Sequence, residues 1–490
     1  MSNLQRKLFG FKSSSRFFQY TLMAISLQLM ATSFINAQDN SPYSRFGLGD
    51  QHPSTNIFNR GMAGISAAYS DPRIDGLNDP RNSRYNYPSI NFSNPASYSR
   101  FYAIKEANTN KLQYGRMLLD VGINTTSHAL HEANDPQSFT STNIYFSYLQ
   151  LGVPIKKNWG LTFGLRPLTT IGYKIDKNER LYDPNTGSMI DSAKTQFTGE
   201  GGSFLFNTGT GFAIRNLSLG VNVGYLFGKK DYGTHRIFQN DTILDYAASN
   251  HETRTNYGGL FFNAGIQYRI DLSQSGMKYL QLGAFGNIQH KLNTRSDLIR
   301  ETFVVSQTDG SDLRIDSVFV QRDVKGELIY PASYGAGFVI EQLPDANKNG
   351  WLIGADYLST NWDNFKINGQ TDLVKTNWQL KVGAQLRPRL KNLNSYKTLL
   401  AYRVGAFFGD DYIYINNQKM PVWGISGGIT LPIANLKDAG SFRRNQKAVI
   451  NISAEYIKRG TNDNPINEDM FRLSFGFNLS DIWFTKRKYE

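Results

Sequence analysis

Two short motifs in this chain carry residue types that could do chemistry. The run Gly424-Ile425-Ser426-Gly427-Gly428 fits the Gly-x-Ser-x-Gly pattern, in which a sharp turn from a strand into a helix exposes the serine as a nucleophile. The run lies within an alternating stretch that predicts a continuous strand, so the required turn is missing. His128 and His131 could bind a metal ion from one helical turn, but we identify no third ligand and interpret their segment as a surface loop. We therefore predict no catalytic residues, no metal, no cofactor and no enzymatic activity.

The elements that position these residues are alternating strands. From Leu217 to Gly228, bulky apolar residues occupy nearly every odd position, and Ser, Gly or Asn occupy most even ones. A period of two places the apolar side chains on one face of a strand. A soluble sandwich would bury that face in a core, whereas a transmembrane barrel turns it towards lipid and keeps polar side chains inside.

Similar segments recur along the chain, and we count fourteen strands after residue 113. The predicted strands cover residues 114–126, 143–155, 158–175, 196–215, 217–229, 252–271, 277–295, 324–342, 349–363, 371–389, 397–411, 418–433, 445–459 and 469–480. Long connections at 127–142, 176–195, 230–251 and 298–323 alternate with tight turns, as in bacterial outer-membrane barrels. The expected fold is all-β: a transmembrane antiparallel β-barrel of about fourteen strands, with twelve and sixteen as alternatives.

The N-terminus has the pattern of a secretory signal peptide. A basic region around Arg6 and Lys7 precedes an apolar run from Tyr20 to Phe34, and Ala37 offers a small residue at the cleavage position. A buried amphipathic helix is the alternative. We expect a signal peptide at residues 1–37, an N-terminal hatch or plug region at 38–112 and the barrel at 113–490.

Composition narrows the function classes. The 490 residues carry a formal net charge of +13, which could face lipopolysaccharide phosphates or anionic ligands. The chain has no cysteine, which excludes disulfides, thiolate chemistry, cysteine metal sites and a lipoprotein anchor. Basic residues are spread along the chain rather than clustered, so nucleic acid is not an expected partner.

The face opposite the apolar one is polar, with residues such as Asn222, Gln267, Asp356, Glu455 and Arg472. A wide water-filled lumen lined in this way would make a porin. The polar region at 38–112 is most economically placed inside the barrel, because larger barrels can be plugged.

Several short motifs are similar to those of a known family. Ser93-Asn94-Pro95-Ala96-Ser97 lies before the first predicted strand, and Asp481-Ile482-Trp483-Phe484-Thr485-Lys486-Arg487-Lys488-Tyr489 lies near the end. With the signal peptide and the strand count, they resemble the FadL/TodX/OmpP1 family of outer-membrane transporters. The predicted mature start, Ser41-Pro42-Tyr43-Ser44-Arg45-Phe46-Gly47-Leu48-Gly49, resembles members from Bacteroidetes.

The resemblance implies passive uptake of hydrophobic molecules such as long-chain fatty acids or aromatic hydrocarbons. It implies that Asn94, Pro95 and Ala96 belong to a hatch that plugs the lumen, although Asn before Pro is also a common turn. It further implies a lateral exit at a kink in the third strand. Pro167 fits that kink on physical grounds, because proline cannot donate to a ladder. An ordinary bulge explains Pro167 equally well, and Pro331 is a second interruption.

The predicted inner face offers a few candidates for substrate binding, namely Arg269, Lys381, Arg403, Phe285 and Phe407. The cations could bind a fatty carboxylate, but pairing with hatch acids such as Asp71 and Asp75 is the stronger expectation, since buried charges need partners. Beyond Phe285, Leu399 and Phe407 we find no continuous apolar stripe on this face. The hydrophobic nature of the substrate therefore rests on the resemblance.

Three functions remain open. The first is an uptake channel for hydrophobic small molecules, the second a FadL-like accessory barrel that binds proteins in secretion or surface assembly, and the third a general porin. In each case we expect a monomer in the outer membrane of a Gram-negative bacterium, in contact with the lipid bilayer and lipopolysaccharide. Protein partners are expected in the second case.

Overall fold

The computed structural model describes residues 41–70, 88–105, 112–132, 138–238, 247–305, 312–345, 347–389, 396–433 and 447–483. The predicted signal peptide lies outside these residues, as do Asp71 and Asp75, the acids expected to pair with inner cations. Within the described ranges, no helix has both the length and the apolar character needed to cross a membrane.

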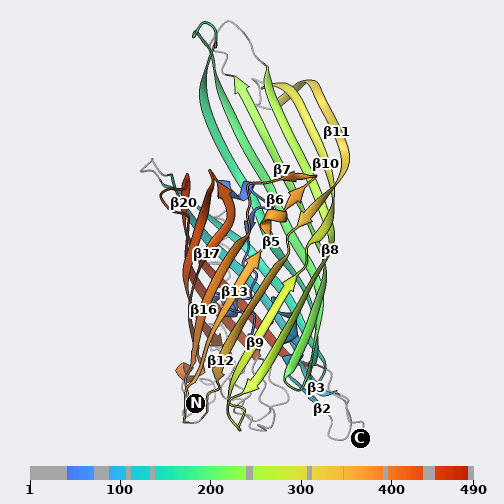
Figure 1. The fold of residues 1–490 in the computed structure, drawn as a ribbon, viewed down its shortest axis with the longest axis vertical. Helices are drawn as coiled ribbons and strands as arrows, with labels where there is room; N and C mark the ends of the chain where they lie inside the picture. The colour runs from blue at the N-terminus through green and yellow to red at the C-terminus, as the bar shows by residue number, and fades with distance from the viewer. Residues whose placement is uncertain are drawn as a thin grey trace, which may run out of the picture.

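A closed antiparallel β-barrel makes up most of the described chain (Figure 1). Its wall has fourteen strands, which confirms the predicted number. The ring closes where β20 pairs with β3, from Ile466↔Glu132 to Trp483↔Gly115. In chain order the wall consists of β3 (Leu112–Glu132), β4 (Ser138–Lys156), β5 (Trp159–Tyr182), β6 (Met189–Ile214), β7 (Leu217–Phe238), β8 (Ala248–Asp271), β9 (Lys278–Asn287) with β10 (His290–Val305), β11 (Asp312–Tyr330) with β12 (Ser333–Gln342), β13 (Gly350–Thr360), β16 (Asn377–Arg387), β17 (Ala401–Ile415), β18 (Gln418–Pro432), β19 (Lys447–Arg459) and β20 (Ile466–Trp483).

The two faces of the wall follow the predicted alternation. On β7, Val221 and Tyr225 are 40% and 50% exposed, whereas Ser218 and Asn222 on the opposite face of the strand are buried. Apolar side chains thus cover the outside and polar side chains line the inside. This arrangement is the one a lipid-facing barrel requires.

The connections predicted as long loops are for the most part strands, so that prediction was wrong. β5 continues to Tyr182, and β6 already begins at Met189. β7, β8, β10 and β11 extend in the same direction. These six strands pair in the order β5–β6–β7–β8–β10–β11 and rise above the rest of the barrel (Figure 1). Their residues lack clean alternation, and pairing with neighbouring strands forms these parts of the sheet.

His128 and His131 also lie in a strand, the upper part of β3, and not in a surface loop. Two wall strands are interrupted at one level. β9 stops before Ile288, and β11 stops before Pro331, the second interruption expected from the sequence. Asn287 Nδ2 donates to the carbonyl oxygen of Pro331 at 3.0 Å, so a side chain replaces part of the missing ladder.

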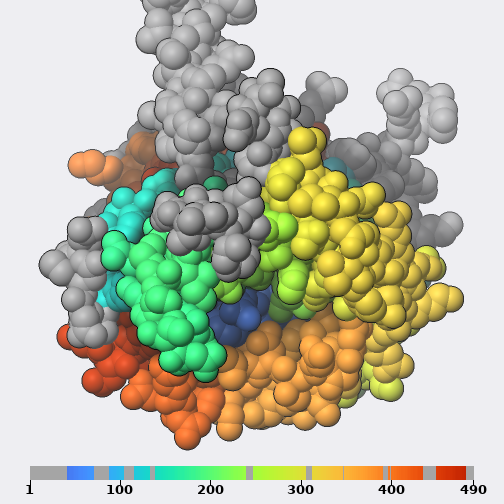
Figure 2. All heavy atoms as spheres, turned by 90° about the horizontal axis from the view of Figure 1, so that it is seen from above, coloured from blue at the N-terminus to red at the C-terminus, as the bar shows by residue number. Residues whose placement is uncertain are grey.

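Residues 41–70 and 88–105, called here the N-terminal segment, pack against the inward-facing side of the wall. They contain η1 (Pro42–Arg45), β1 (Asp50–Gln51), α2 (Ile57–Arg60), η2 (Pro95–Arg100) and β2 (Ala103–Lys105). Asn56 and Asn94 cap α2 and η2 by accepting hydrogen bonds from backbone amides. Seen from above, the start of this segment is visible in the mouth of the barrel (Figure 2).

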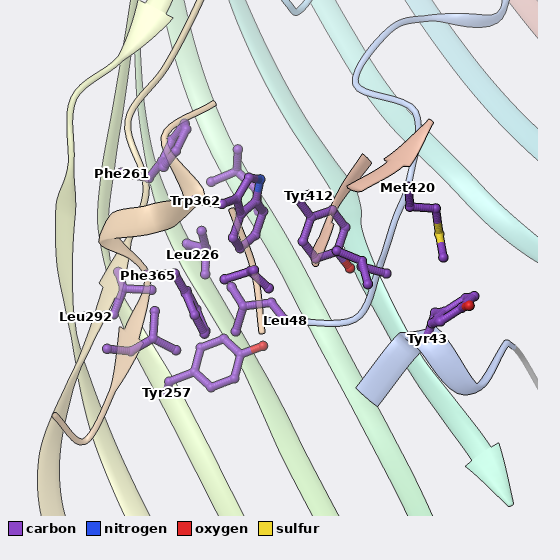
Figure 3. Packing of buried hydrophobic residues seen from close by; sticks show 14 residues of the cluster. Tyr43, Leu48, Leu226, Tyr257, Phe261, Leu292, Trp362, Phe365, Tyr412 and Met420 are labelled. Carbon is purple, nitrogen blue, oxygen red and sulfur yellow. The ribbon is translucent and has the colours of Figure 1, made fainter. Parts of the chain in front are cut away.

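The largest apolar core lies between the N-terminal segment and the wall (Figure 3). Tyr43 and Leu48 from the segment meet wall residues such as Leu226 and Phe261. Trp362, at the start of η3 (Trp362–Asn364), reaches the same cluster from the connection that also contains β14 (Lys366–Ile367) and β15 (Gln370–Thr371). The inner face is therefore more apolar than the sequence indicated, because wall strands and other segments both contribute to this core.

Candidate functional site

The ring is not hydrogen-bonded along its whole height. β4 and β5 pair only from Lys156↔Trp159 to Leu149↔Leu165. Above that level β4 pairs with β3 alone along residues 138–148, and β5 pairs with β6 along residues 166–182. We call the gap between these two stretches the seam.

Pro167 lies two residues above the last β4–β5 pair. The β5–β6 ladder shifts register between Pro167 and Thr169, as a bulge does. The bulge expected from the sequence is therefore present, and it lies where β5 leaves β4. A role of Pro167 in lateral exit stays a prediction.

The N-terminal segment bridges the seam. β1 adds to the free edge of β5, with Asp50 opposite Thr170 and Gln51 opposite Thr169. His52 Nε2 lies 2.6 Å from Thr170 Oγ1, and its ring lies 4.3 Å from that of Tyr145 on β4. Burial lowers the pKa of His52 to about 3, with a further contribution from the positive charges of Arg472 and Arg60.

A cavity of about 990 Å³ lies behind the seam. Residues 143–145 of β4 and 170–173 of β5 line it, so it reaches the edges of the gap. Much of its lining is charged, with Arg60, Arg254, Lys381, Arg459 and Arg472 as cations and Asp50, Glu200, Asp231, Glu252, Asp411 and Glu455 as acids. The site suits a ligand with a polar or ionic group better than a pure hydrocarbon.

Arg60, on α2, anchors the N-terminal segment to the wall. Its guanidinium donates to Asn124 Oδ1 at 2.6 Å and to Ser147 Oγ at 2.6 Å, and Nε donates to the carbonyl oxygen of Thr55 at 3.1 Å. Below it, Asp356 Oδ2 accepts from the amides of residues 66 and 67 at 2.5 and 2.7 Å. These bonds satisfy buried groups that would otherwise be costly.

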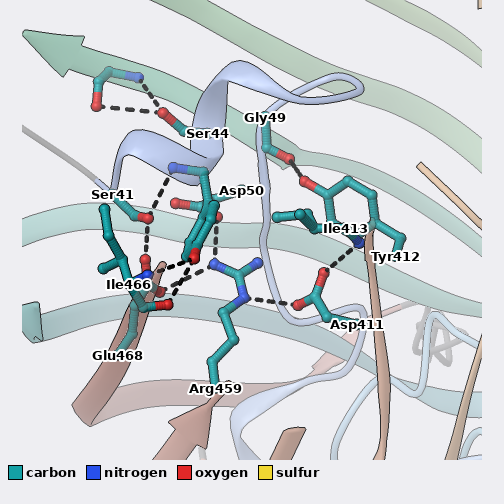
Figure 4. Close-up of polar contacts among 12 residues, drawn as sticks. Ser41, Ser44, Gly49, Asp50, Asp411, Tyr412, Ile413, Arg459, Ile466 and Glu468 are labelled. Carbon is teal, nitrogen blue, oxygen red and sulfur yellow. Dashed lines mark hydrogen bonds and ion pairs between the residues drawn. The ribbon is translucent and has the colours of Figure 1, made fainter. Parts of the chain in front are cut away.

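A second anchor holds the start of the segment near the upper rim (Figure 4). Arg459 contacts three carboxylates: Asp50 at 3.0 Å, Asp411 at 2.7 Å and Glu468 at 3.1 Å. Ser41 Oγ donates to Glu468, and Tyr43 donates to the carbonyl oxygen of residue 466 at 2.6 Å. Burial raises the pKa of Tyr43 to about 12. Tyr412 of β17 also donates to the carbonyl oxygen of Gly49 at 2.8 Å, so the segment is tied to β17, β19 and β20.

The five predicted substrate residues are not brought together. Lys381 and Phe407 line the cavity. Arg403 is buried, stacks 3.5 Å from the ring centre of Phe58 and donates to Gln385 Oε1 at 2.9 Å. Arg269 pairs with Asp271 at 2.8 Å and lies over the ring of Tyr279. Phe285 packs under Gly335. Substrate binding by any of them stays a prediction.

Lys381 differs from the other cations. Arg269 and Arg403 have partners within the fold, whereas Lys381 makes no hydrogen bond or ion pair with any described residue. Its ammonium lies close to Gly64: a Cβ added at Gly64 would be 3.6 Å from Lys381 Nζ. Of the predicted candidates, it is the one cation that lines the cavity, and the carboxylates of Asp356 and Glu455 act on it electrostatically.

The motif Asn94-Pro95-Ala96 lies deep against the wall. Asn94 Oδ1 accepts from the Ala96 amide at 3.1 Å, and Asn94 Nδ2 donates to the carbonyl oxygen of Ala67 at 2.6 Å. The motif is thus the cap of η2 and also joins the two halves of the N-terminal segment. Its assignment to a hatch stays a prediction.

Ser426 has no nucleophilic environment. Its Oγ accepts from the Ala63 amide at 2.8 Å, within strand β18. Ser426 lies within a continuous strand and not at the turn from a strand into a helix that the nucleophile motif needs.

Inward-facing glycines are a functional feature that the sequence analysis missed. A Cβ at Gly220 would lie 2.2 Å from the Pro95 carbonyl carbon, and one at Gly283 would lie 2.0 Å from the Ala67 oxygen. Similar contacts occur at Gly160 and Gly383. Glycine on the polar face of a strand marks a close approach of backbone, and this signal could have located the docked segment.

Fold and site together define a closed fourteen-stranded barrel with a polypeptide segment docked on its inner wall and a charged cavity behind a gap in that wall. The chain belongs to the BamG family, whose model matches residues 19–490.

Several solved structures align with this chain, and their titles name channels or transporters. They include the CymD monoaromatic hydrocarbon channel, with 14% identity over 88% of this chain and 98% of that one and a TM-score of 0.45. The Ralstonia pickettii toluene transporter TbuX has 12% identity, the same coverage and a TM-score of 0.45. The Pseudomonas putida toluene transporter TodX has 14% identity over 89% and 99% and a TM-score of 0.46. No curated protein matches this sequence.

Proposed function

We propose that the chain is an outer-membrane channel for passive uptake of hydrophobic small molecules that carry a polar or anionic group. The N-terminal segment would act as the plug, and the end with the raised strands would face the cell exterior, because long connections lie on that side in such barrels. The observation that carries the proposal is the charged cavity that reaches the unpaired edges of β4 and β5.

Four features support this route. The apolar exterior fits a bilayer, and the cavity volume fits a small ligand. The seam lies beside the membrane, with Ile144 and Phe146 exposed on its outer side. Lys381 supplies a cation on the cavity wall. A fatty acid would place its carboxylate near Lys381 and its chain towards the seam.

The test is extraction of bound molecules from protein purified out of its native membrane. Mass spectrometry should detect an acid-bearing amphiphile, and Lys381→Met should lower its occupancy. Arg269→Gln is the matched control, because Arg269 pairs within the fold and does not line the cavity. A consistently empty protein with an open, ion-conducting lumen would contradict the proposal and favour a general porin.

The second candidate function is an accessory barrel that binds other proteins. One observation favours it: apolar side chains remain exposed on β10 and β11 above the barrel, where no lipid is expected. Ile315, Val318 and Phe319 are 57%, 68% and 44% exposed. Exposed apolar patches often mark interaction sites. Stoichiometric partners in a pull-down, with normal uptake after deletion, would favour this function.

A further inference from the structure

The seam leaves one edge of β4 without a neighbouring strand. Residues 138–148 pair with β3 on one side, and the pairs with β5 begin only at Leu149. Apart from Asn143, the residues of this stretch make no backbone hydrogen bond to any described residue outside their ladder with β3. The edge is therefore a row of donors and acceptors in an otherwise closed ring.

This edge begins within the apolar band of the barrel. Ile144 and Phe146 are 50% and 38% exposed, and Ile123, opposite Phe146 on β3, is 48% exposed. Open sheet edges are not tolerated in hydrocarbon unless they are covered by protein or line a water-filled cavity. The cavity reaches residues 143–145 from the inner side. The edge therefore lines the cavity on its inner side, and a segment that replaced water along it would bind through its backbone.

The two faces of the edge specify the side chains of such a partner. Ile144 and Phe146 point to the outside, whereas Tyr145 lines the cavity and Ser147 is buried. A strand added beside them would meet lipid on one face and polar groups on the other. This is the alternation of a transmembrane β-strand.

The opposite edge of the seam already accepts a strand. β1 pairs with Thr169 and Thr170 of β5, and the amide of His52 donates to the carbonyl oxygen of Leu168 at 2.8 Å. This intramolecular pairing covers only a short part of β5, and β1 forms its ladder with β5 and not with β4. The seam is thus a place where extended chain binds through its backbone.

We propose that the seam edge of β4 binds an amphipathic β-strand of another membrane β-barrel chain. The bound strand turns its apolar side chains towards lipid and its polar side chains towards the cavity. The inference rests on the proposed membrane location but not on the identity of the cargo.

The chain has no cysteine, so single cysteines give a clean test. The probe is a synthetic peptide that copies residues 469–480, an alternating wall strand, with one cysteine placed at each position in turn. It is added to Ser141→Cys or Thr142→Cys protein in lipid nanodiscs, and disulfide yield is measured. Ser141 and Thr142 are adjacent and therefore face opposite sides of β4.

Yields should alternate along the probe with a period of two, and the two variants should favour opposite sets of positions. A probe that is N-methylated at consecutive residues has no amide donors on either edge. It should lose the signal, because it cannot form the ladder. Yields that show no alternation, or that survive N-methylation, would overturn the proposal. The assay needs no bound cargo, so an empty cavity would contradict the proposed uptake and leave a positive result here intact.

Discussion

Alanine at Gly220 should weaken the docking of the N-terminal segment. Its Cβ would lie 2.2 Å from the carbonyl carbon and 2.3 Å from the oxygen of Pro95, and 2.5 Å from the Ala96 nitrogen. Ordinary carbon contacts are about 3.5 to 4.0 Å, so the backbone of η2 must move by more than about 1 Å. Overpacking of this kind costs roughly 1 to 3 kcal/mol.

The matched control is Gly427→Ala, because the nearest atom to an added Cβ at Gly427 is 3.9 Å away. Both variants are unfolded in detergent by urea or heat, and cleavage of the N-terminal segment by protease is followed in parallel. Gly220→Ala should lower the free energy of unfolding by roughly 1 to 3 kcal/mol and speed cleavage of the segment. The control should do neither. Equal behaviour of the two variants would refute the close approach of η2 to the wall.

Three further predictions concern the seam and the anchors. Burial lowers the pKa of His52 to about 3, so His52 is neutral in the folded protein at neutral pH. Its contribution to the free energy of unfolding is complete above its ordinary pKa of about 6.5 and is lost as the pH falls from there towards 3, by about 1.4 kcal/mol per pH unit. Protease cleavage near His52 should therefore accelerate at acid pH, and His52→Phe should remove that acceleration; a pH-independent rate in the parent protein would contradict it. Arg459→Met should destabilise the protein by about 3 to 5 kcal/mol, since it leaves three carboxylates without their cation; thermal unfolding checks this, and a shift no larger than that of Lys419→Met, whose side chain is exposed, would count against the anchor. Pro167→Val should straighten β5 and reduce uptake of a labelled fatty acid, and unchanged uptake by correctly folded protein would remove Pro167 from the mechanism.

The strand count and the facing of side chains could be predicted from the sequence because lipid imposes a strict alternation. On β7, Val221 and Tyr225 face outwards and Asn222 faces inwards, as expected. The raised parts of β5 to β11 could not be predicted, because their sequences lack that alternation. Pair formation with neighbouring strands decides their structure, and a single sequence does not display it.

The site was predictable only in part. Pro167 marked a bulge in β5 because proline leaves a ladder bond unmade, but nothing in the sequence indicated that β1 would cover that edge. Arg403 and Lys381 have the same inward pattern, yet one stacks on Phe58 and the other lines the cavity. That difference arises from contacts between residues more than 300 positions apart, which periodicity does not encode.

The most direct test of the proposed route is photo-crosslinking of a labelled fatty acid during uptake. Benzoylphenylalanine is placed at Tyr145, which lines the cavity beside the seam, or at Tyr357, which is exposed on the outer wall. The route predicts strong crosslinking at Tyr145 that competes with unlabelled fatty acid and falls in the Lys381→Met variant. Crosslinking that is equal at both positions, and insensitive to competitor, would contradict passage through the cavity.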